Sequence, residues 1–437
     1  MKRTCGTSSH PAQLLLMGGM RSLLPSAFLA LCLASVACNG ASEDAAGAED
    51  SFTSNAGATL ELRFKGEVVT VASDTPRRAV ASQLQYVQGQ LVENAGANAA
   101  TFIPTLTNVR EVVEGDKKRI SYEAALAVAW PKTSPTPTTY ELVLPRDITA
   151  LAAFNAKYDG PCGHAKYGSD TFWYNFDPKA EACSLDAADV QRTVATVAPH
   201  PQSTQGMYPE YDKIWADDTL DMVAVFGIIS GNTPSDDGAV TREKLLTDVS
   251  ATLRGATRTE GPATQGILKE STVTGKVDVN GRERTVNLTG ILVQEVSGAG
   301  SRFEARYEQL SAKADLAVYY GHSGLGKNIK ALARITGAQR GKYQLVYLYA
   351  CQTLGYLDPA MFERRAALNE GDPDGTKYLD IIANTLVAYG DQGRAFFDLY
   401  KVVLDQRTPK TFNQIIRSAS SSHIPVVYGE HDNTFRP

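Results

Sequence analysis

The sequence predicts an α/β protein in which a smaller β-rich N-terminal domain precedes a largely parallel sheet flanked by helices. Apolar and polar residues alternate through much of the segment from Thr59 to Pro145, which is the pattern of half-buried strands. Beyond residue 215, short apolar runs alternate with stretches whose apolar residues recur at helical spacing, and this order is typical of mostly parallel sheets. A chain of 437 residues is long enough for two cores, so we expect domains over 58–200 and 215–437.

The N-terminal domain is expected to contain several strands and one helix. Its apolar runs, separated by proline and glycine clusters, cover residues 60–71, 120–130 and 140–144. A helix is predicted over 77–90. Residues 185–214 are expected to form a polar connection to the second domain.

The second domain begins with a nearly continuous apolar run over 220–229, which predicts a strand buried on both faces. The dipeptide Asn280-Gly281 between two alternating runs predicts a β-hairpin. The other elements follow in alternation along the chain: helices over 245–253, 303–310 and 328–335, and strands over 316–320, 343–350 and 424–428.

Residues 1–38 have the features of an export signal. Arg21 precedes an apolar run over 23–33, and small residues follow up to Cys38. The run is shorter than the roughly 20 residues that cross a membrane, so a secretory signal is favoured over a membrane-spanning anchor. Met20 lies directly before Arg21 and is an alternative start of translation.

The end of this segment resembles a bacterial lipoprotein signal, in which a cysteine after small residues is lipidated and becomes the mature N-terminus. Cys38 would be that residue, although Ser35 stands where such signals usually carry Leu, Val or Ile. Ordinary cleavage after Ala37 is the alternative. Residues 39–57, rich in small and acidic residues, are expected to form a flexible tether. The resemblance therefore implies a lipoprotein of the cell envelope, anchored to the membrane through its lipid.

The cysteines divide into groups with different expected fates. Removal of the signal leaves four of the six, and lipidation would occupy Cys38. Cys162 and Cys183 flank one loop, and a disulfide between them would contribute about 3 kcal/mol to stability. Cys351 is then left as a free thiol, which is either a buried inert residue or a reactive one.

Two predicted strands end in residues that carry chemistry. One strand leads into His322, and the next leads into Cys351, 29 positions later (351 − 322). A helical crossover joins the two strands, so we expect them to be parallel and their carboxyl ends to share one edge of the sheet. A thiol beside an imidazole is an arrangement for nucleophilic acyl transfer.

These two blocks resemble the caspase, gingipain and legumain group of cysteine peptidases, in which one apolar strand ends in His-Gly and another in Ala-Cys or Gly-Cys. Tyr349-Ala350-Cys351-Gln352 fits the second block, whereas Ser323 separates His322 from Gly324 in the first. The resemblance implies a caspase-like domain that cleaves peptide bonds with a Cys–His dyad. It also implies an oxyanion hole built from the backbone N–H groups of Gly324 (or Ser323) and Cys351, and a helix over 384–404.

Two other hypotheses fit the same residues. Cysteines that end buried strands are usually core residues, so the chain would then be a non-catalytic surface lipoprotein that keeps the caspase-like fold for binding a partner. The segment Gly321 to Lys327 also matches the phosphate-binding pattern G-x-x-x-x-G-K, but Asn328 replaces the Ser or Thr that binds Mg²⁺. Nucleotide binding is therefore the least favoured of the three.

Composition and spacing exclude further classes of function. A net charge of −5 and the lack of a long basic run give no footprint for nucleic acid binding. The histidines show no ligand spacing for a metal, and no cofactor is expected. The side-chain preference for a peptide or protein substrate stays open, because Asp358 or Asp391 would favour basic side chains and Arg334 or Arg394 acidic ones.

Overall fold

The computed structural model describes residues 57–101, 103–165, 169–200, 206–231, 233–262, 264–388, 393–417 and 425–437. They belong to one compact unit of the chain, Gly47–Pro437. The expected signal segment, Cys38 and the tether up to residue 56 lie outside the described residues. None of the described helices has the length and the apolar character needed to cross a membrane.

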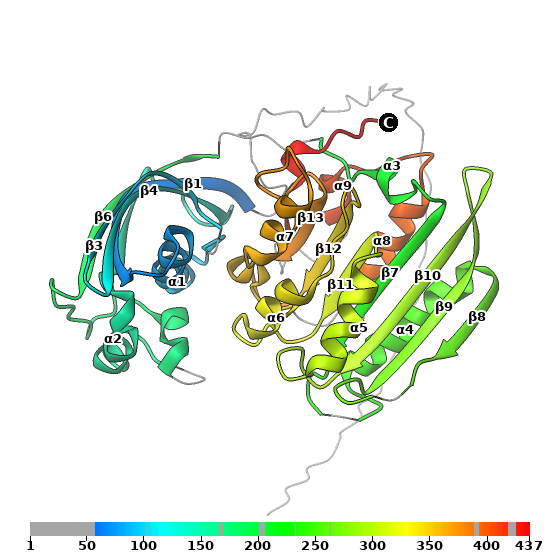
Figure 1. Cartoon of the computed structure of the whole chain (residues 1–437), viewed down its shortest axis with the longest axis horizontal. Coiled ribbons are helices and arrows are strands. Elements are labelled where there is room, and N and C mark those ends of the chain that lie inside the picture. The colour runs from blue at the N-terminus through cyan, green and yellow to red at the C-terminus, as the bar shows by residue number, and fades with distance from the viewer. Residues whose placement is uncertain are drawn as a thin grey trace, which may run out of the picture. The chain divides into compact units, whose positions relative to one another are not determined.

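In the described part of the chain, the first half forms an antiparallel six-stranded sheet (Figure 1). The strands lie in the order β2 (Asn98–Ala99), β4 (Lys117–Pro131), β1 (Gly57–Val71), β6 (Val190–Pro199) and β5 (Thr139–Pro145), with β3 (Thr105–Glu114) also paired to β4. The long β1 and β4 pair over their whole lengths, from Gly57 opposite Pro131 to Val71 opposite Lys117.

Helix α1 (Pro76–Ala95) packs on this first sheet. Thr75 caps its first turn by accepting a hydrogen bond from the Arg78 N–H, and Gly96 ends it with a φ of 61°. Apolar residues of α1 share a buried cluster with the inward side chains of β1 and β4. The predicted helix over 77–90 is therefore confirmed, and it is longer than the sequence pattern indicated.

The second half of the chain forms a sheet of eight strands among the described residues, and this sheet is largely parallel (Figure 1). Its order is β14 (Pro425–Tyr428), β13 (Leu379–Asn384), β12 (Gln344–Tyr349), β11 (Leu316–Tyr320), β7 (Thr219–Gly227), β10 (Arg282–Val293), β9 (Lys269–Val279) and β8 (Arg254–Glu260). The five strands from β13 to β10 are mutually parallel, and the outer pairs are antiparallel.

Helices cover both faces of this second sheet (Figure 1). The apolar side chains of α5 (Ser301–Ser311), α6 (Lys327–Ile335) and α7 (Ala360–Leu368) join one buried cluster, and those of α4 (Asp237–Thr252), α8 (Arg394–Leu404) and α9 (Phe412–Ile416) join another. Alternate residues of β7 enter the two clusters, Val223 and Val225 on one side and Met222 and Phe226 on the other. The prediction of a strand buried on both faces is confirmed.

Two predicted segments are wrong. Residues 185–214 were expected to form only a polar connection, yet they contain β6, most of whose side chains are exposed or half-buried. The segment 384–404 was expected to be helical from its start, but Asn384 ends β13 and the helix begins at Arg394. Neither strand shows the apolar alternation by which half-buried strands are recognised, since β6 mixes polar and apolar residues on both faces, with Val194 exposed, and β13 is buried on both faces.

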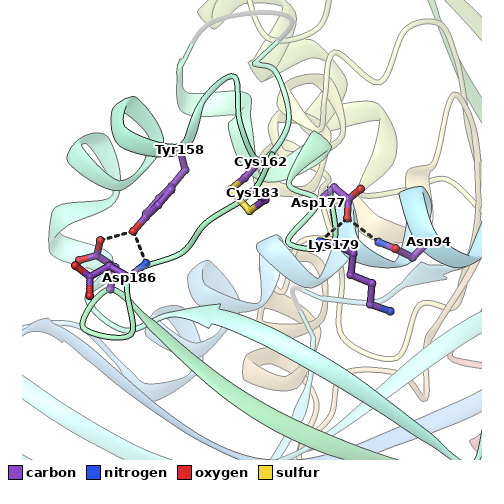
Figure 2. Close-up of a disulfide and its surroundings, with 8 residues drawn as sticks. Asn94, Tyr158, Cys162, Asp177, Lys179, Cys183 and Asp186 are labelled. Atoms are coloured by element: carbon purple, nitrogen blue, oxygen red, sulfur yellow. Dashed lines mark hydrogen bonds between the residues drawn. A yellow bond between two sulfur atoms is a disulfide. The ribbon is translucent and has the colours of Figure 1, made fainter. Parts of the chain in front are cut away.

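Beside the first sheet, a disulfide joins Cys162 to Cys183, the pair that flanks one loop in the sequence. Figure 2 shows the surroundings of this bond, where Asp177 accepts hydrogen bonds from the Asn94 side chain and the Lys179 N–H. The segment between the two cysteines contains the short helix η2 (Ser169–Asn175). Aromatic side chains of η2 are buried in the cluster that covers one face of the second sheet.

Candidate functional site

His322 and Cys351 follow neighbouring parallel strands at matching positions. Strands β11 and β12 pair in parallel, with Tyr320 opposite Tyr349. His322 and Cys351 each lie two residues beyond that last pair, and both line one pocket of about 850 Å³. The topology expected from the helical crossover is therefore present, and the two side chains share one edge of the sheet.

The imidazole of His322 is held by a main-chain atom of the loop after β7. Its Nε2 lies 2.8 Å from the carbonyl oxygen of Ile229. A carbonyl oxygen only accepts hydrogen bonds, so Nε2 carries the proton in this contact. In the neutral imidazole, Nδ1 is then the nitrogen that can accept a proton.

The backbone around His322 is fixed by two side chains. The His322 carbonyl accepts hydrogen bonds from the Tyr319 hydroxyl at 2.7 Å and from the Asn328 Nδ2 at 2.8 Å. The Asn328 Oδ1 accepts in turn from the Ser297 N–H at 2.9 Å. Burial raises the pKa of Tyr319 well above its ordinary value, so this hydroxyl stays a donor.

Cys351 is half-buried at the start of the turn after β12. Its Sγ lies 4.0 Å from the carbonyl oxygen of Ala388. Gln352, the next residue, has a φ of 51°, a conformation that is costly for residues other than glycine. Its N–H donates to the Leu386 carbonyl at 3.0 Å, which holds the turn against the segment after β13. Among the described residues, no hydrogen bond joins the thiol to the imidazole, and such pairs often tighten only when substrate binds.

The two backbone groups of the expected oxyanion hole, those of Gly324 and Cys351, belong to residues that line the pocket. Within the described part of the chain, no acceptor takes either N–H. In the loop between β11 and α6, three successive residues, Gly324, Leu325 and Gly326, have positive φ values of 59°, 50° and 89°. Within the described residues, both N–H groups are therefore available to a ligand.

In the same loop, the backbone N–H groups that a phosphate-binding loop would direct at its ligand are hydrogen-bonded to carbonyl oxygens of the loop itself. The N–H groups of Gly326 and Asn328 donate to the Ser323 carbonyl, and that of Lys327 donates to the Gly324 carbonyl. Asn328 is buried and spends its amide on neighbouring backbone, as described above. These bonds close a turn, whereas a phosphate-binding loop directs successive N–H groups at its ligand.

The pocket is also lined by residues from the first half of the chain. Thr171 and Tyr174 of η2 contribute to the wall. The Tyr174 hydroxyl donates a hydrogen bond to the Oε1 of Gln352, beside Cys351. Glu295 and Lys327 bring opposite charges to the lining.

Three of the four residues that the sequence offered for side-chain preference lie outside the described lining of the pocket. Within the described residues, Asp358, Arg334 and Arg394 are not part of the pocket lining. Asp391 lies outside the described residues. The described part of the pocket lining therefore shows no excess of either charge by which a basic or an acidic side chain would be selected.

Sequence reasoning did not find the contacts that organise this site. The Ile229 carbonyl is a main-chain atom and leaves no signal in residue type. The Tyr174–Gln352 bond joins positions 178 apart in the chain. One local signal was present in the sequence. Asp236-Asp237-Gly238 precedes apolar residues at helical spacing, which is the pattern of a helix N-cap, and in the structure Asp236 caps α4.

No known family profile matches this chain, and a search of curated proteins finds no match. Among the described residues, no three His, Cys, Asp or Glu side chains are placed to hold a metal ion.

Proposed function

We propose that this chain is a cysteine peptidase of the caspase-like kind, with Cys351 as nucleophile and His322 as the base. One observation carries the proposal. The two residues extend neighbouring parallel strands by the same number of residues and line one pocket. If Cys351 were only a core residue and His322 only a turn residue, nothing would require them to follow neighbouring strands at the same distance and to line one pocket.

The arrangement supports a covalent reaction. The Cys351 thiol passes its proton to Nδ1 of His322, and Sγ attacks the peptide carbonyl carbon. The backbone N–H groups of Gly324 and Cys351 stabilise the oxyanion that forms. The C–N bond breaks as His322 returns the proton to the leaving amine, and water then hydrolyses the thioester. The Ile229 carbonyl stabilises the imidazolium through the Nε2–H bond.

Thiol labelling of the folded, non-denatured protein tests the proposal. Iodoacetamide is expected to alkylate Cys351 without denaturant, and His322→Ala should slow this alkylation by about tenfold or more, because the base that takes the thiol proton is lost. His164→Ala is the matched control, since His164 is exposed and lies outside the pocket lining. Peptidase activity on a mixed peptide library should disappear in Cys351→Ala.

The same experiment decides between this proposal and a non-catalytic surface protein. The non-catalytic hypothesis is supported by one observation: among the described residues, no hydrogen bond joins the Cys351 thiol to the His322 imidazole. Alkylation of Cys351 that requires denaturant, or that proceeds equally fast in His322→Ala, would favour a partner-binding role. A peptidase activity that persists in Cys351→Ala would rule out the dyad.

We also propose that the protein is exported and held at the cell envelope by a lipid on Cys38. The support is the residue pattern before Cys38, with Arg21 ahead of a short apolar run. The substrate would then be a peptide or protein outside the cytoplasm.

A further inference from the structure

The loop Ile229–Gly231, which carries the carbonyl oxygen that contacts His322, is held by one carboxylate. Strand β7 ends at Gly227, so ladder hydrogen bonds do not extend along this loop. The Oδ2 of Asp236 accepts instead from three successive N–H groups, those of Ile229 at 3.0 Å, Ser230 at 2.8 Å and Gly231 at 3.2 Å. Their convergence on one oxygen fixes the direction of the Ile229 peptide unit.

Asp236 itself is locked in place. It is only 1% exposed, and its Oδ1 caps α4 by accepting from the Gly238 N–H at 2.9 Å. A Cβ on Gly238 would lie 2.0 Å from the Gly227 carbonyl oxygen, so a glycine is required for the first turn of α4 to lie on the end of β7. Burial acts to raise the pKa of Asp236, but the hydrogen bonds from the loop and from Gly238 outweigh it and lower that pKa.

We propose that Asp236 is a positioning residue for His322. Through the loop, it aims the Ile229 carbonyl at Nε2, selects the Nε2–H tautomer and leaves Nδ1 to receive the thiol proton. Asp236 acts through this main-chain contact and does not touch the reacting atoms. The catalytic role of this tautomer rests on the proposed peptidase function. The selection of the Nε2–H tautomer by Asp236 does not depend on that function.

Two substitutions separate this role from helix capping. In Asp236→Asn, the oxygen can keep the cap on Gly238 and its 3.2 Å contact with the Ile229 N–H, but an NH₂ group then faces the Ser230 and Gly231 N–H donors and repels them. Asp236→Ser also caps a helix well, but its side chain is too short to reach the loop. Asp237→Asn is the matched control, because it makes the same change of charge at the neighbouring, exposed position.

Nitrogen-15 NMR of histidine-labelled protein reads the tautomer without requiring activity, and His322→Ala assigns the signal. Wild type and Asp237→Asn should show the Nε2–H form of the neutral ring, whereas both Asp236 variants should show a mixture of forms. In peptide hydrolysis, the Asp236 variants should lose about tenfold or more in kcat, with KM changed by less than about twofold.

Three results would overturn or separate the claims. An unchanged His322 tautomer in both Asp236 variants would refute the positioning role. A loss of folding in both variants, judged by circular dichroism against Asp237→Asn, would assign Asp236 to stability alone and would also refute it. A tautomer change in the Asp236 variants, combined with a wild-type protein that cleaves no peptide, would refute the peptidase function and leave the role of Asp236 in place.

Discussion

Asp380 is a buried acid on β13 with two donors and acidic neighbours. Its Oδ2 accepts hydrogen bonds from the Tyr343 hydroxyl and from the Asn433 Nδ2. Burial raises the pKa of Asp380 to about 8, and the nearby charges of Asp432 and Glu210 add to this rise, while the two hydrogen bonds oppose it. The folded protein therefore holds this carboxyl neutral under conditions in which an exposed aspartate is ionised.

Stability should fall as pH rises from about 4 to about 8 because of this residue. In the unfolded chain an aspartate titrates near pH 3.9, so over this range the folded state binds a proton that the unfolded state has released. Asp380→Asn should flatten that decline, because its amide oxygen still accepts from Tyr343 and Asn433. Urea unfolding measured at several pH values, with the exposed Asp237→Asn as control, checks this. Parallel curves for wild type and Asp380→Asn would contradict it.

At the residue scale, the sequence located side chains but not their main-chain partners. His322 and Cys351 were recognisable because each follows an apolar run that ends abruptly in a residue able to transfer protons or attack carbonyls. The Ile229 carbonyl was not recognisable, since every residue carries one. The left-handed conformation of Gln352 was equally hidden, because glutamine gives no local reason for a positive φ.

At the scale of elements, strong periodicity was the reliable guide. The hairpin at Asn280-Gly281 is present, with both residues in the left-handed region at φ values of 56° and 79°. Strand β6 was missed, because its pairing depends on β1 and β5 and its own polar and apolar residues do not alternate between a buried and an exposed face. Pairing between distant segments is a tertiary effect that a local pattern does not contain.

The disulfide covalently joins the two ends of the segment that includes η2. Replacing both Cys162 and Cys183 by alanine should lower the free energy of unfolding by about 3 kcal/mol, because the bond closes a loop with a separation of 21 residues. Guanidinium unfolding measures the difference, and Cys351→Ala is a control that leaves the bond intact. A loss below about 1 kcal/mol would show that the packing of η2 suffices without the bond.

At the scale of the whole molecule, the two sheets share a core in the described structure. Tyr86, Phe154 and Trp173 of the first half belong to the same buried cluster as Leu354 and Tyr356, which follow Cys351. The rings of Trp173 and Tyr356 meet edge to face, with centroids 6.0 Å apart. The first half thus supports the turn that carries the candidate nucleophile.

Anchoring to the membrane belongs to the whole chain and has its own test. In a bacterial host fed labelled palmitate, the wild-type chain should incorporate label and fractionate with membranes, because acyl chains on Cys38 bury themselves in the bilayer. Cys38→Ser should lose the label and leave the membrane fraction. Cys32→Ser, which changes a cysteine inside the apolar run, serves as the control. Label retained in Cys38→Ser would show that another residue is acylated.

The contact between Ile229 and His322 has a consequence for how this protein can change over evolution. The atom that orients the histidine is a backbone carbonyl oxygen. The contact therefore does not depend on which side chain stands at position 229, because other residues supply the same carbonyl. Proline is the exception, because it lacks the N–H that bonds to Asp236. The constraint from this contact is thereby transferred to Asp236, so divergent relatives are expected to preserve this acid even where position 229 changes to another residue that packs against the same core.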